Sequence, residues 1–131
     1  MGLDQKITLR KVYYGPRNST KADVDTYEYW FRKVNSLQGY MEEKYQTKNT
    51  EEHEINWDDI EYLHSVSSYI LENNKDVEYM KENPPTQEGF FYGSTEYDEW
   101  YLEDMKHLNE VTTELLSMKD DSAHLTYWCW W

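Results

Sequence analysis

The feature that most constrains the fold of this chain is the source of its apolar surface, which is aromatic rather than aliphatic. The sequence contains 6 Trp and 13 Tyr among 131 residues, whereas Leu, Ile, Val and Phe are sparse. Each aromatic side chain brings roughly 150–250 Å² of buriable area and a polar edge that can stay at the surface. We therefore expect a folded protein with a core of Trp and Tyr, and a single domain over residues 1–131.

Two segments far apart in the sequence have the residue pattern of β-strands. Residues 6–14 alternate apolar and polar side chains and end at the Gly15-Pro16 turn. Residues 123–131 are β-prone and strongly aromatic, and such a tail is a liability in water unless it packs. We predict that the two segments pair in a small antiparallel sheet, and we expect a short extended piece at residues 53–55.

Three other segments have apolar residues at helical spacing. The first spans residues 25–46, the second follows Asn56 as far as Asn73, and the third follows a cap at Ser94 or Thr95. Together these patterns predict an α+β domain. In it, about three helices pack on a small antiparallel sheet that includes the N- and C-terminal strands.

The negative charge of the chain is unevenly distributed. Residues 41–131 carry 22 Asp and Glu against 6 Lys and Arg, whereas residues 1–40 carry 4 against 7. A strong negative field repels nucleic acid and attracts basic protein surfaces, so we expect a protein partner and no direct binding of nucleic acid. The competing interpretation is that the net charge of −13 only keeps an aromatic-rich protein soluble.

The carboxylates in and just before the third predicted helix are mostly displaced from its apolar stripe. They form the predicted acidic partner-binding face. Its members are Glu96, Asp98, Glu99, Glu103, Asp104, Glu110 and Glu114.

Several classes of function lack their usual sequence signature. Cys129 is the single cysteine, which excludes an intrachain disulfide and fits a reducing cytosol. Residues 53–57 begin like a zinc-protease helix, but Trp57 stands where the second histidine is required. No Ser/His or Cys/His pair has a catalytic spacing, and no stretch approaches the roughly 20 apolar residues that span a bilayer. We therefore predict no enzymatic activity, no metal, no cofactor and no membrane partner.

A second candidate site combines cationic, amide and aromatic side chains in an otherwise acidic chain: Trp30, Arg32, Lys33 and Asn35. In one interpretation the two cations pair with carboxylates of the third helix, and the amide fixes a turn. In the other, these residues form an aromatic-walled pocket for an anionic small molecule, together with the loop at residues 89–94. The aromatic residues of that loop are Phe90, Phe91 and Tyr92.

Three motifs and an aromatic tail stand out along the chain. The motifs are Met1–Asp4, Tyr29–Asn35 (YWFRKVN) and Pro85–Tyr101 (PTQEGFFYGSTEYDEWY). With them the chain resembles, over most of its length, a family of small, largely uncharacterised tailed-bacteriophage proteins. Such relatives are expected to carry a histidine a few residues after the asparagine, where this chain has Gln38. The resemblance implies an accessory protein acting in the cytoplasm of an infected bacterium, and it implies no known reaction.

Two functional hypotheses follow. The first is an interaction protein that binds and inhibits a host protein, such as a defence protein or a nucleic-acid-binding protein whose DNA the acidic face mimics. The second is a protein that binds or sequesters a nucleotide signal. Under either hypothesis the aromatic tail packs within its own chain or into a neighbouring copy, so a homo-oligomer is one assembly open to this chain.

Overall fold

The computed structural model describes residues 3–14, 22–73, 75–76, 78–79 and 99–131. In this part of the chain the strands are β1 (Asp4–Tyr14), β2 (Ala22–Arg32), β3 (Glu52–Ile55) and β4 (Ala123–Trp130). The helices are α1 (Asn35–Tyr45), α2 (Trp57–Glu72) and α4 (Glu99–Ser117). The fold is therefore α+β, as the sequence predicted.

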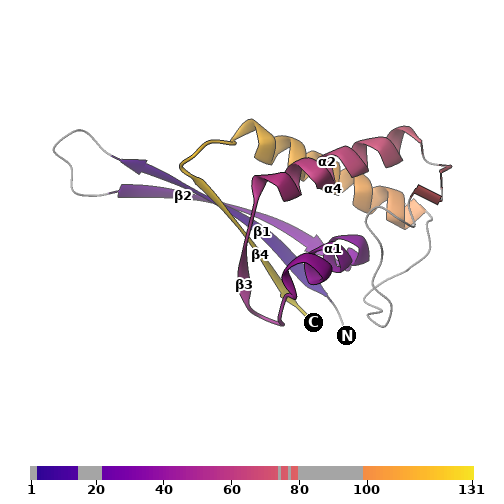
Figure 1. Ribbon diagram of the computed structural model, residues 1–131, viewed down its shortest axis with the longest axis horizontal. Helices are drawn as coiled ribbons and strands as arrows, with labels where there is room; N and C mark the ends of the chain where they lie inside the picture. The colour runs from indigo at the N-terminus through magenta and orange to yellow at the C-terminus, as the bar shows by residue number, and fades with distance from the viewer. Residues whose placement is uncertain (1–2, 15–21, 74, 77, 80–98) are drawn as a thin grey trace.

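The four strands form one antiparallel sheet in the order β2-β1-β4-β3, and helices α2 and α4 lie side by side (Figure 1). Strand β1 pairs with β4 from Asp4 opposite Trp130 to Lys11 opposite Ala123. This pairing confirms the prediction that the terminal strands meet in the sheet. The extended piece expected at residues 53–55 is also confirmed, because it belongs to β3, which pairs with β4.

The prediction of one helix over residues 25–46 is wrong, because this range contains most of β2 and the whole of α1. Tyr27 and Phe31 are four residues apart, and that spacing puts two side chains on the same side of a helix or of a strand. The aromatic and β-branched run in residues 24–31 pairs residue by residue with β1, which decides for the strand. The strand ends before Lys33, whose φ of 56° lies in the left-handed region.

The other two helix predictions agree with the structure where it describes them. Helix α2 begins after Asn56 and ends before Asn73, as expected. Helix α4 is described from Glu99 onward, so the caps predicted at residues 94 and 95 lie outside the described residues.

The core is mainly aliphatic, which corrects the expectation of a core built from Trp and Tyr. Among the Trp and Tyr side chains that the structure describes, only Tyr127 has no exposed area, whereas Trp30 and Trp130 are 52% and 53% exposed. The few aliphatic residues suffice because they occupy inward positions of the strands and inner stripes of the helices. The fully buried Leu and Ile side chains are Leu3, Ile7, Leu9, Leu37, Ile60, Leu63, Ile70, Leu108 and Leu115.

A buried polar network fastens the start of α1 to the inner face of the sheet. The amide of Gln5 accepts a hydrogen bond from the Val34 N–H at 2.9 Å and donates to the Val34 carbonyl at 3.0 Å. It also donates to the hydroxyl of Tyr127 at 2.9 Å, and that hydroxyl donates to Gln38 Oε1 at 2.6 Å. One side chain of β1 therefore joins β4 to the first turn of α1.

Replacing Gln5 by Leu should lower the free energy of unfolding by about 2 kcal/mol, because it leaves the buried Val34 N–H without its acceptor. The Val34 carbonyl keeps a second donor, the Gln38 N–H. Urea denaturation followed by far-UV circular dichroism measures the change.

Thr8→Val is the matched control. The hydroxyl of Thr8 is buried on the same strand and has no hydrogen-bond partner among the described residues, so its removal should leave stability unchanged or raise it. Equal losses in the two variants would show that the Gln5 network contributes nothing specific.

Candidate functional site

The acidic residues predicted on α4 are distributed between its solvent face and its flank. Glu99, Glu103, Glu110 and Glu114 are exposed and recur at spacings of four, seven and four residues, which keeps them on one side of a helix. We call these four residues the acidic stripe. Asp104 is only partly exposed and lies off the stripe, while Glu96 and Asp98 lie outside the described residues.

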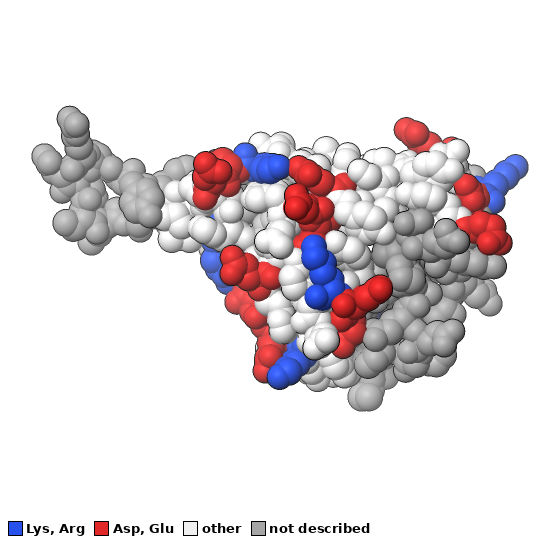
Figure 2. Space-filling model, viewed as in Figure 1, with Lys and Arg blue, Asp and Glu red and all other residues white. Residues whose placement is uncertain are grey.

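The stripe is distinguished by the grouping of four exposed carboxylates on one side of a helix, because other exposed carboxylates such as Glu43 and Glu72 also form no ion pair among the described residues. Figure 2 shows acidic and basic side chains interspersed on the visible face, and five carboxylates form ion pairs with Lys or Arg. Those five are Glu28, Glu52, Asp59, Glu61 and Asp120. In the described part of the chain no stripe residue forms such an ion pair, although Lys106 is exposed on the same side of the helix.

One end of the stripe contacts the sheet. Burial and the neighbouring Glu114 carboxylate, which accepts a hydrogen bond from the phenol, raise the pKa of Tyr29 to about 12. Tyr29 belongs to β2, so Glu114 connects α4 to the edge strand. A second contact between α4 and β2 is made by the His107 ring, whose Nε2 lies 2.9 Å from the Trp30 carbonyl oxygen.

The second candidate site is only partly described. Trp30 and Arg32 are exposed on β2, and Lys33 is exposed in the connection that follows. Asn35 is buried at the first turn of α1. Phe90, Phe91 and Tyr92 lie outside the described residues. A cavity of about 420 Å³ at the end of α2 is lined by Glu72, Asn73, Lys75 and Asp76, and none of these residues was predicted to hold a ligand.

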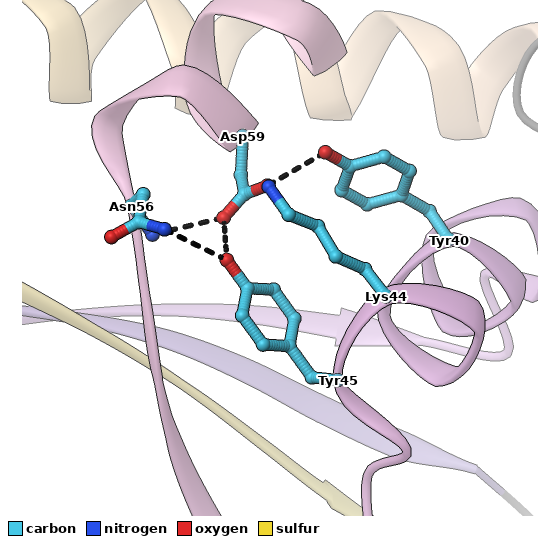
Figure 3. Close-up of polar contacts among 5 residues, drawn as sticks. All are labelled: Tyr40, Lys44, Tyr45, Asn56 and Asp59. Carbon is cyan, nitrogen blue, oxygen red and sulfur yellow. Dashed lines mark hydrogen bonds and ion pairs between the residues drawn. The ribbon is translucent and has the colours of Figure 1, made fainter.

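The densest polar cluster surrounds Asp59, whose side chain has no exposed area, and the sequence analysis did not identify it (Figure 3). The carboxylate accepts hydrogen bonds from the Tyr40 hydroxyl at 2.6 Å and from the Asn56 N–H at 2.9 Å. It also accepts from the Lys44 ammonium and from the Tyr45 hydroxyl. Three donors thus come from α1 and one from the residue that precedes α2.

The electrostatics of this cluster suit a structural role. Burial disfavours the charged form of Asp59, but the four donors outweigh it and hold the pKa of the carboxyl below 3.8. The hydrogen bond to Asp59 also raises the pKa of Lys44. A carboxylate that is inaccessible and fully engaged has no lone pair left to take a proton from a substrate. The cluster therefore binds α1 to the start of α2 and is not an acid–base site.

The single cysteine and the metal-binding potential of the described residues were the other sites of possible chemistry. Burial raises the pKa of the Cys129 thiol, so the thiolate that nucleophilic attack requires is disfavoured. No group of His, Cys, Asp and Glu within the described ranges is arranged to hold a metal ion. None of the described helices combines the length and apolar character needed to cross a bilayer.

Comparison with known proteins identifies no relative: no protein-family model, no curated protein and no solved structure matches the chain. The functional interpretation of this protein therefore rests on its own residues.

Replacing Asp59 by Asn should lower the free energy of unfolding at pH 7 by about 2 kcal/mol, because it removes hydrogen bonds to a charged acceptor. The pKa of Asp59 is lower in the folded state than in the unfolded state. The charged carboxylate therefore stabilises the folded state at pH values above 3.8. This contribution is lost as the pH falls through the pKa of the folded state. Urea titrations between about pH 7 and pH 2 should show that the free energy of unfolding falls less steeply with pH in the variant than in the wild type.

Asp58→Asn is the control, because Asp58 is the exposed neighbour of Asp59 in the first turn of α2. Its effect on stability should stay within about 0.5 kcal/mol. If the free energy of unfolding of Asp59→Asn fell with pH as steeply as that of the wild type, the cluster would not be the source of this pH dependence.

Proposed function

We propose that this protein is a non-catalytic accessory protein that binds and inhibits a host protein through the acidic stripe of α4. The observation that supports the proposal is the exposure of the stripe, whose carboxylates form no ion pair with Lys or Arg among the described residues. Elsewhere on the described surface, five carboxylates are paired with neighbouring cations, whereas the four of the stripe are unpaired and gathered on one side of one helix. A basic surface would therefore be attracted to α4.

The spacing of the stripe favours a basic protein surface over full imitation of DNA. From Glu99 to Glu114 a helix rises about 22 Å, at 1.5 Å per residue. One strand of duplex DNA presents about six or seven phosphates over that length, compared with the four carboxylates of the stripe. The stripe thus has about half the charge density of a phosphate track. Four carboxylates are nevertheless enough to contact a limited basic patch, such as part of a nucleic-acid-binding surface, because such a contact does not require the phosphate spacing of DNA.

The resemblance to tailed-bacteriophage proteins supplies the biological setting of the proposal. A phage accessory protein would meet its partner in the cytoplasm of the infected bacterium. Host proteins that bind nucleic acid are abundant there and carry basic surfaces, which makes them suitable targets for an anionic inhibitor.

The proposal predicts that the protein displaces host proteins from immobilised duplex DNA. Bacterial lysate is loaded on the DNA, and purified protein is then applied at about 50 mM and about 200 mM salt. Displacement should occur at low salt and weaken steeply at the higher salt, because the Debye length shortens. The variant with Glu99, Glu103 and Glu110 all replaced by Gln should displace the same proteins at least about tenfold less effectively.

A control variant separates the stripe from overall charge. Replacing Glu43, Glu51 and Glu72 by Gln removes the same number of exposed carboxylates from other elements. This variant should behave like the wild type. Equal weakening in both variants would show that only net charge matters, and no displacement by the wild type would remove the proposal.

A further inference from the structure

One face of the four-stranded sheet is covered by no described helix. The odd-numbered residues of β1 and β4 point into the core, as the buried side chains of Ile7, Leu9, Leu125 and Tyr127 show. Because successive residues of a strand alternate between faces, the even-numbered residues lie on the opposite, outer face, where Thr8 on the central strand is only 1% exposed. The most exposed large side chains of that face include Trp30 and Trp130.

Near one end of the outer face, two tryptophans and a lysine form an ordered group. Lys6 is paired with Trp30 on one side and with Trp128 on the other. Its ammonium lies 5.2 Å from the centre of the Trp30 ring and 5.5 Å from that of Trp128. The two rings meet edge to face with their centres 6.0 Å apart. These contacts hold both aromatic side chains in fixed positions at the surface, which lowers the entropy cost of binding through them.

The outer face is almost neutral, although the chain is strongly anionic. Its basic residues are Lys6, Arg10 and Arg32. Its acidic residues are Asp4, Glu28, Glu52 and Glu54. Three positive and four negative charges give a net of −1, so −12 of the total of −13 lies elsewhere in the chain. Two of the cations are already paired on this face, Lys6 with Glu28 and Arg10 with Glu52.

This charge distribution favours a second copy of the chain as the occupant of the face. Two copies carry like charges and repel each other wherever their acidic surfaces meet. The outer face is where that repulsion is smallest and where exposed tryptophan, a residue enriched in the energetic centres of interfaces, is concentrated. We propose that the outer face of the sheet is the interface of a homodimer.

The size of the face is sufficient for a weak dimer. Strands of 11, 11, 8 and 4 residues, about 4.8 Å apart and rising about 3.3 Å per residue, cover roughly 500 Å². Two copies would together bury about 1,000 Å², which is at the lower limit for a specific interface. An interface of this size is typical of weak or transient association.

Sedimentation velocity of the full chain tests the proposal at about 1 to 100 µM protein and at about 50 and 500 mM salt. The wild type should dimerise with rising concentration, and the dimer should be tighter at high salt because screening reduces the repulsion between anionic copies. Binding through the acidic stripe has the opposite salt dependence, so either proposal can fail without the other.

Two variants disrupt the face in different ways. One is the double variant Trp30→Ser and Trp130→Ser, and the other is the single variant His124→Glu. The double variant removes two exposed rings and should raise the dissociation constant at least about tenfold. His124 is exposed and paired with Arg10, so a carboxylate there is compatible with the fold. It should weaken the dimer mainly at low salt, and this second variant decides the question if the first does not fold.

Tyr69→Ser is the matched control, because Tyr69 is an exposed aromatic residue on α2 and should not affect self-association. Far-UV circular dichroism verifies the fold of each variant. A wild type that stays monomeric at every concentration and salt would overturn the proposal. The proposal would also be overturned if the folded double variant dimerised as tightly as the wild type. The same holds if the folded His124→Glu protein did so at low salt.

Discussion

The structure depends on the position of β1 between β2 and β4. A central strand has hydrogen-bonding partners on both edges, so its alternation of side chains is imposed on the whole sheet. Its odd-numbered residues define the face that the helices cover, and Gln5 on that face also holds the first turn of α1. Its even-numbered residues define the outer face, where Lys6 separates two tryptophans. A shift of one residue in this register would exchange the two faces.

The fold was predictable where one pattern pointed to one structure. Residues 6–14 alternate with a period of two, and the α4 segment keeps a period close to 3.6 over many turns, so both elements follow from the sequence. Residues 25–46 were ambiguous, because the pair Tyr27 and Phe31 fits a helix and a strand equally well. Only the pairing with β1, which is a long-range interaction, resolves that ambiguity.

The candidate sites also differ in whether they could be predicted from the sequence. The exposed stripe of α4 follows from helical spacing alone and could be anticipated from the sequence. The environment of Asp59 could not, because Tyr40, Lys44 and Tyr45 reach it from another helix. The group of Trp30, Lys6 and Trp128 likewise combines three strands. Composition suggested buried aromatic rings, but the described tryptophans lie at or near the surface, where large rigid side chains serve contacts between molecules.

The place of β4 in the sheet affects when the protein can fold during its synthesis. Lys11 pairs with Ala123, so the ribosome must add 112 further residues after Lys11 before β1 acquires its second neighbour. At bacterial elongation rates this takes on the order of ten seconds. During that interval β1 can pair only with β2, and the β4 side of the core that contains Ile7 and Leu9 is incomplete. Strand β4 can therefore join the sheet only late in synthesis, after β1 and β2 are available to pair.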